Sequence, residues 1–310
     1  MSDLYRYEKK PIEYSVTQEP DCVEYIFPTN YNDPVHENEQ VYLRVYSPSN
    51  RPLRGDILFL HGIGGSNIRF LERFPKFFAS KGYRASMVIL PYHQKRKPVH
   101  MESGDPFYSA EPDLCVVRFH RAVKDVRRSA DLIETLEGFH SDRLWLVGVS
   151  FGGMIGTLTM GLDQRFRKGA LVITGGNWRW INFHCPYTHK VRAEYSNKGN
   201  AYGCDSEETC IRKFRPDPVG WVKREVRRVE DIFEKAPIPC YQYDPISFAP
   251  LIRSPVLFIR GVFDRVIPSQ ATDELLHLLP NPYVVRYPMG HTTSIVLTGL
   301  IARRIIRFFD

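Results

Sequence analysis

The sequence predicts an α/β fold, with one doubly wound, mostly parallel sheet and a cap inserted over it. Two observations support this prediction. Short apolar runs, typical of strands buried on both faces, alternate with stretches in which apolar residues recur every three to four positions. This alternation stops between 178 and 250 and then resumes. Because helical crossovers connect parallel strands, we expect a core at 1–177 and 251–310 and an inserted cap at 178–250.

The first half of the chain supplies the leading strands. Residues typical of strands at 22–27 and 41–46 predict an antiparallel pair. The elements expected after this pair are a buried strand at 55–60, a helix at 70–81, a strand at 83–91 and a helix at 113–137. The segment 92–112 shows no period and is expected to be a surface loop. Its basic cluster, Lys95-Arg96-Lys97, is either solvated or directed at an anionic substrate.

The second half continues the same alternation on either side of the insertion. Before it, we expect a strand at 144–149, a helix from 154 to 160 and a strand at 169–174. After it, we expect a strand at 255–261, a helix at 269–279, a strand at 283–287 and a closing helix at 292–309.

Composition is that of an ordinary globular protein. Of the 310 residues, 43% are hydrophobic and 25% are charged. No apolar run is long enough to span a membrane, and the first ten residues lack the apolar core of a secretory signal, so we expect a cytoplasmic protein. Its six cysteines are then expected as reduced thiols. The net charge of +7 is accompanied by no nucleic-acid-binding motif, and no nucleic-acid partner is expected.

The strand at 144–149 runs directly into Gly148-Val149-Ser150-Phe151-Gly152, a G-x-S-x-G pattern. In a sharp turn from strand to helix, the serine backbone is strained and its hydroxyl projects above the end of the sheet. The positions two before and two after it must then lack bulk, and both are glycine. The following helix would direct backbone N–H groups and a partial positive charge at Ser150. The pattern therefore predicts a nucleophilic serine.

A serine hydroxyl needs a base, and the base needs a carboxylate that fixes its tautomer. Asp264 follows the buried strand at 255–261, and His291 follows the strand at 283–287. Both are therefore expected at the same end of the sheet as Ser150. The alternatives are a turn aspartate and a core histidine.

Four motifs together resemble the α/β-hydrolase superfamily over nearly the whole chain. They are the loop His61-Gly62, the turn at 148–152, the turn holding Asp264, and the pair Gly290-His291. The resemblance implies that Ser150 is the nucleophile, His291 the general base and then acid, and Asp264 the group that orients the histidine.

The resemblance also implies an oxyanion hole. Its donors would be the backbone N–H groups of Phe151 and Ile63, with Gly62 or Gly64 as alternatives to Ile63. His61 is expected to brace its loop rather than to act as a base.

The implied reaction is cleavage of a carboxylic ester, or a related acyl bond, in a small molecule through an acyl-enzyme and without a cofactor. Acyl transfer and peptidase or amidase activity use the same triad and stay open. Serine at position 150 argues against the dehalogenase and epoxide hydrolase branches, which have aspartate there. A binding protein on a hydrolase fold is disfavoured by the complete set of three residues.

The insertion is expected to form a lid that sets substrate choice. Trp178 and Trp180 stand where it leaves the sheet, and they either bind substrate or fill the core of the cap. Residue types that can bind zinc also occur in the insertion, at Cys185, His189, Cys204 and Cys210. Their spacing fits no compact zinc motif, so we expect isolated thiols and imidazoles and no metal.

Overall fold

One sheet of nine strands runs through the described part of the computed structural model, residues 4–64, 68–195, 202 and 204–310. Its strands lie in the order β1-β2-β3-β5-β4-β6-β7-β8-β9. They are β1 (Ser15–Gln18), β2 (Val23–Pro28), β3 (Gln40–Tyr46), β4 (Gly55–Leu60), β5 (Tyr83–Val88), β6 (Leu144–Val149), β7 (Lys168–Val172), β8 (Val256–Gly261) and β9 (Tyr283–Tyr287).

The six neighbouring strands β5, β4, β6, β7, β8 and β9 pair in parallel. The strands β1, β2 and β3 are antiparallel additions at the β5 edge. The predicted doubly wound, mostly parallel sheet is therefore confirmed. The inner strands β4 and β5 are buried along their whole length, as their apolar runs indicated. β1 was not predicted, because its four exposed residues show no apolar alternation.

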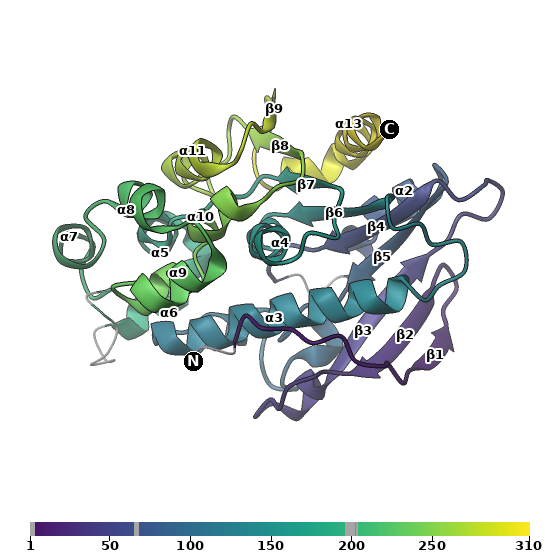
Figure 1. Ribbon diagram of the computed structural model, residues 1–310, viewed down its shortest axis with the longest axis horizontal. Coiled ribbons are helices and arrows are strands. Elements are labelled where there is room, and N and C mark those ends of the chain that lie inside the picture. The colour runs from purple at the N-terminus through teal and green to yellow at the C-terminus, as the bar shows by residue number, and fades with distance from the viewer. Residues whose placement is uncertain (1–3, 65–67, 196–201, 203) are drawn as a thin grey trace.

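Helices cover both faces of the sheet (Figure 1). One face is covered by α3 (Pro112–Ile133), α4 (Phe151–Leu162) and α11 (Ser269–Leu278), whose buried side chains belong to one apolar core. The other is covered by α2 (Arg73–Ala79) and α13 (Thr298–Phe309), which belong to a second core. Two short helices precede these, α1 (Ile68–Leu71) before α2 and α12 (Thr293–Val296) before α13. The single helices predicted at 70–81 and 292–309 are thus each divided in two.

The insertion forms a group of short helices at one end of the molecule, beside α3, α4 and α11 (Figure 1). They are α5 (Trp178–His184), α6 (His189–Glu194), α7 (Glu207–Thr209), α8 (Pro218–Glu225), α9 (Val229–Lys235) and α10 (Pro245–Phe248). Their apolar residues, among them Ile181, Val222 and Ile232, are part of the core on the α3 face. The insertion therefore extends an existing core on one flank of the sheet.

A buried ion pair fixes the insertion to the end of β7. Arg215 and Asp244, both fully buried, lie 2.5 Å apart. Asp244 also accepts the backbone N–H groups of Asn177 (2.7 Å) and Trp178 (2.9 Å), the residues at which the insertion begins. Because a buried charge is tolerated only when it is paired and hydrogen-bonded, this cluster holds the two ends of the insertion together.

Among the described helices, none has both the length and the apolar character that crossing a bilayer requires.

Candidate active site

Ser150 occupies a strained turn between β6 and α4. Its φ of 55° and ψ of −119° lie outside the regions that L-residues favour. A Cβ at Gly148 would stand 2.4 Å from the carbonyl oxygen of Gly152, and a Cβ at Gly152 would stand 2.2 Å from that of Leu60. Only glycine fits at both positions, so the G-x-S-x-G pattern is explained by the tightness of this turn.

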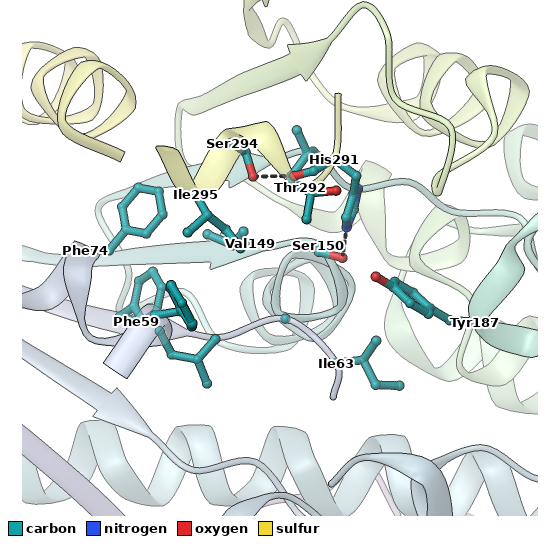
Figure 2. A pocket seen from close by; sticks show the side chains of 14 residues that line it. Phe59, Ile63, Phe74, Val149, Ser150, Tyr187, His291, Thr292, Ser294 and Ile295 are labelled. Atoms are coloured by element: carbon teal, nitrogen blue, oxygen red, sulfur yellow. Dashed lines mark hydrogen bonds between the residues drawn. The ribbon is translucent and has the colours of Figure 1, made fainter. Parts of the chain in front are cut away.

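Ser150, His291 and Asp264 form one hydrogen-bonded chain. Figure 2 shows the part of it that joins Ser150 to His291. The serine Oγ lies 2.9 Å from His291 Nε2, and His291 Nδ1 lies 2.8 Å from Asp264 Oδ2. With the imidazole proton on Nδ1, the ring donates to the carboxylate and accepts from the hydroxyl. A histidine in this arrangement can take up the hydroxyl proton as the oxygen attacks an electrophile.

The backbone around Asp264 and His291 holds both side chains in place. The second carboxylate oxygen of Asp264, Oδ1, accepts the backbone N–H groups of Val266 (2.8 Å) and Ile267 (3.0 Å). This turn follows β8 and leaves Oδ2 directed at the histidine. The carbonyl of His291 accepts the Ser294 hydroxyl at 2.6 Å, which joins the histidine to α12. The side chains in this site are therefore preorganised by hydrogen bonds from two separate loops.

The loop after β4 lies against Ser150. A Cβ placed on Gly62 would be 3.5 Å from the Cβ of Ser150, so the backbones of the two segments approach closely. His61 supports this loop: its Nε2 accepts the N–H of Leu90 at 3.1 Å, and its Nδ1–H donates to the carbonyl of Gly62 at 2.8 Å. Burial lowers the pKa of His61 to about 4, so its ring is neutral at pH 7. These contacts give His61 a structural place in the loop.

A cavity of about 320 Å³ opens beside Ser150 and His291. Most of its wall is apolar and includes Phe59, Phe70, Phe74, Val149, Ile173 and Ile295. In Figure 2, Phe59 and Phe74 lie on one side of the serine hydroxyl and Tyr187 lies on the other. Several wall residues come from β4, α2 and α12, so the cavity lies on the face of the sheet opposite to α3 and α4.

The sequence did not indicate these wall residues. Phe74 and Ile295 follow the loops that hold Ile63 and His291, and this proximity in the chain is the one signal that could have identified them. Of the described residues of the insertion, Tyr187 lines the cavity, and no local sequence pattern indicated this position.

Trp178 and Trp180 are not among the residues that line this cavity, and their surroundings favour the second predicted alternative, that they fill a core. Trp178 is 1% exposed, and its ring packs against Phe119 at 5.4 Å and Tyr243 at 5.3 Å in the core on the α3 face. Its backbone N–H also donates to Asp244 at 2.9 Å, which fixes the start of α5. Trp180 donates from Nε1 to Glu274 on α11 at 2.9 Å.

The basic cluster at 95–97 is not directed at the site either. Arg96 is fully buried and pairs with Asp125 at 2.7 Å, while Lys95 pairs with Glu24 at 2.6 Å. The cluster therefore attaches the loop to α3 and β2, and the predicted alternatives of a solvated loop and a substrate contact both miss the structural role of Arg96.

The cysteines of the described residues are free thiols. Over the same part of the chain, no group of three or more His, Cys, Asp or Glu side chains is placed to hold a metal ion.

The fold and the strained serine turn define the class of protein, a hydrolase built on a mostly parallel sheet. Residues 57–298 match the Alpha/beta hydrolase family, and the chain belongs to that family. Among curated proteins, no sequence matches the chain.

Solved structures with a similar fold include esterases and peptidases. The acetyl xylan esterase from Paenibacillus sp. R4 is 16% identical with a TM-score of 0.59, and the match covers 97% of this chain and 89% of that one. An acylaminoacyl peptidase from Pyrococcus horikoshii is 14% identical with a TM-score of 0.58, covering 97% and 40%. The enol-lactonase from Burkholderia xenovorans LB400 is 18% identical with a TM-score of 0.52, covering 87% and 96%. At these identities the similarity establishes the fold.

Proposed function

We propose that the protein is a serine hydrolase that cleaves carboxylic esters through an acyl-enzyme. The observation that supports this most strongly is the unbroken hydrogen-bonded chain from Ser150 through His291 to Asp264. In this proposal Ser150 is the nucleophile, His291 the general base and then the general acid, and Asp264 the residue that orients the imidazole and stabilises its cation.

The proposed cycle has two halves. The hydroxyl oxygen of Ser150 attacks the ester carbonyl while His291 Nε2 takes its proton, and the tetrahedral intermediate then expels the alcohol, which receives that proton. A water molecule next attacks the acyl-enzyme, again giving its proton to His291, and Ser150 leaves with the proton restored. The carboxylic acid is released, and no cofactor takes part.

The negative charge of the intermediate would be held by the backbone N–H groups of Phe151 and Ile63. Phe151 is the first residue of α4, so its N–H has no acceptor within the helix and faces the same end as Ser150. Ile63 belongs to the loop that approaches Ser150 and lines the same cavity. Backbone donors fixed in this way stabilise an oxyanion without reorganising during the reaction.

The cavity favours a substrate with an apolar acyl or alcohol group. Its wall is built mainly from phenylalanine, valine and isoleucine side chains, and burial of each methylene of a substrate there would contribute about 0.8 kcal/mol. We propose Tyr187, in place of the two tryptophans, as the contribution of the insertion to substrate binding. All six cysteines are free thiols, which supports a reducing compartment such as the cytoplasm.

A panel of p-nitrophenyl esters of increasing acyl length, measured beside matched anilides, lactones and an added alcohol acceptor, tests this proposal. We expect kcat/KM to rise with chain length until the cavity is filled, and to be far lower for the anilides. Faster turnover of anilides than of esters would instead identify a peptidase or amidase. Formation of a new ester from the added alcohol in preference to the acid would identify an acyltransferase.

A further inference from the structure

Exposed apolar side chains gather around the mouth of the cavity. Of the eleven large hydrophobic side chains that are exposed among the described residues, five belong to segments that contribute to this site, and a sixth, Leu300, lies on α13, the next helix after α12. These six are Phe70, Tyr187, Val262, Phe263, Val296 and Leu300. Soluble proteins rarely expose contiguous apolar surface without a binding function. This group of exposed side chains is therefore a candidate binding surface.

Five of these residues are placed at the site by their neighbours. Phe70 and Tyr187 line the cavity. Val262 and Phe263 form the turn directly before Asp264, and the carbonyl oxygen of Phe263 would lie 3.2 Å from a Cβ on Gly290, next to His291. Val296, 77% exposed, follows the wall residue Ile295 on α12, the segment drawn beside the cavity in Figure 2.

The helices on one side of this mouth carry positive charge. The chain from 288 to 309, which includes α12 and α13, contains no aspartate or glutamate. Over residues 68–79, which hold α1 and α2, the one acidic residue is Glu72 between the two helices, which is 5% exposed and is paired with Arg44 and Lys76. No exposed acid on these four helices offsets their arginines.

Apolar and basic side chains are interleaved on these helices. Leu300, Arg303, Arg304 and Arg307 are exposed at helical spacing along α13 and so share its outer side. The Arg73 guanidinium lies 5.1 Å from the centre of the Phe70 ring, at the cavity wall. We call the surface formed by Phe70, Arg73, Val296, Leu300, Arg303 and Arg304 the α1/α13 face. Arginines beside exposed aliphatic and aromatic groups are the pattern of helices that bind at a bilayer surface.

We propose that the α1/α13 face docks on the surface of an anionic phospholipid bilayer. Its apolar side chains would enter the boundary between headgroups and acyl chains, and its arginines would bind lipid phosphates. Pairing of the face with a second copy of this chain is disfavoured, because a two-fold interface would bring the arginines of the two copies together. The formal net charge of +7 adds attraction to the same surface.

Docking in this way directs the mouth of the cavity at the lipid. The apolar cavity wall and the apolar rim then form a continuous path from the bilayer to Ser150. It follows, if the proposed esterase activity holds, that substrates include amphiphilic esters that partition into membranes. The binding step itself does not depend on that activity.

Sedimentation with vesicles tests the docking. The chain would carry Ser150→Ala, so that no lipid is cleaved, and the vesicles would contain either phosphatidylcholine alone or a mixture with phosphatidylserine. We expect a partition coefficient at least tenfold higher for the anionic vesicles, falling as salt is raised. Val296→Ser with Leu300→Ser, and separately Arg303→Glu with Arg304→Glu, should each lower it at least tenfold.

Matched control variants lie away from the face. Val16→Ser changes an exposed residue of the edge strand β1, and Lys223→Glu with Arg224→Glu makes the same change in net charge on α8, at the other end of the molecule (Figure 1). The controls should bind vesicles like the parent chain. In the background with Ser150 intact, all variants should hydrolyse a water-soluble acetate ester at the parent rate, which shows that they are folded.

Three results would overturn the proposal. Equal binding to both kinds of vesicle would show that anionic lipid is not required. An equal loss of binding in the control variants would show that the α1/α13 face is not the docking surface. A concentration-dependent dimer that Val296→Ser with Leu300→Ser abolishes, without vesicle binding, would show that a second copy covers the face. Absence of ester hydrolysis together with normal vesicle binding would contradict only the proposed function.

Discussion

The two faces of the sheet differ in how closely they are filled. On the face of α3, α4 and α11, aromatic side chains such as Phe119, Phe151 and Trp178 pack in ring contacts, and the insertion adds a further layer of helices to them. On the face of α2 and α13, Phe59, Phe74 and Ile295 leave a cavity of about 320 Å³ beside Ser150. The insertion therefore extends the packing on one flank, and it supplies Tyr187 to a cavity whose other described wall residues come from the rest of the chain.

The largest expected effect concerns the hydrogen-bonded chain of Ser150, His291 and Asp264 at the end of the sheet. Asp264→Asn should lower kcat by about 10⁴-fold with little change in substrate binding, because an amide holds the imidazole in the wrong tautomer. Steady-state kinetics with a p-nitrophenyl ester would measure this. Both faces should stay folded, and unchanged thermal unfolding is the control. A loss of only a few-fold would mean that another carboxylate orients His291.

A large effect on stability, rather than on specificity, is expected on the filled face. Trp178→Ala should lower the free energy of unfolding by about 3–5 kcal/mol, because it empties a buried aromatic position. Urea denaturation would measure the loss. The ratio of kcat/KM for long and short esters should stay as in the parent chain wherever the variant is folded. A changed ratio in a variant that is as stable as the parent chain would indicate that Trp178 contacts the substrate.

Acid should destabilise the filled face, which α3, α4 and α11 cover, before the open face, which α2 and α13 cover. The buried histidines of the described chain, His61, His93 and His120, contact residues on the α3 and α4 side. Burial lowers the pKa of His61 and His120 to about 4 and that of His93 to about 3. An unfolded histidine takes up a proton near pH 6.5, whereas these remain neutral in the fold, so stability is lost as pH falls from 6.5 towards 4.

For each of these histidines, lowering the pH from 7 to 5 should decrease the free energy of unfolding by about 2 kcal/mol. Hydrogen exchange, corrected for the intrinsic rate, should therefore show a greater loss of protection in α3 than in α13. His120→Gln should reduce the loss in α3. Equal losses in the two helices would show that these histidines do not distinguish the faces.

The smallest effect is expected from filling the open face. Ile295→Trp places a larger side chain at the cavity wall, so kcat/KM for a long acyl ester should fall about tenfold while that for an acetate is kept. Leu275→Met on α11, on the filled face, is the matched control and should leave both values unchanged. A uniform loss on all esters from Ile295→Trp would place the acyl group elsewhere.

The sequence predicted those parts of the molecule that depend on local constraints. Alternating apolar runs and helical periods located the parallel sheet, since each strand and crossover carries its own pattern. The glycines around Ser150 and the positions of Asp264 and His291 after strands predicted three side chains that the structure brings together. Parallel strands end at one edge, so this part of the site follows from topology.

Features that depend on contacts distant in the chain could not be predicted in this way. The backbone N–H of Trp178 bonds to Asp244, 66 residues later in the chain, and no local sequence pattern indicates that bond. The cavity wall combines β4, α2 and α12, and apolar residues there have the same spacing as a filled core. Arg96 stands between two lysines in the sequence, which predicts a surface position. Its buried partner, Asp125, lies on α3, and the sequence alone does not reveal that pairing.

The most direct test of the account is labelling with a fluorophosphonate, followed by mass spectrometry of the labelled peptide. A serine activated by His291 and Asp264 should react stoichiometrically at Ser150, and Ser150→Ala should abolish both the label and ester turnover while the chain stays folded. Asp264→Asn should slow the labelling strongly. Labelling at another residue, or ester hydrolysis at the parent rate by Ser150→Ala, would contradict the assignment of Ser150 as the nucleophile.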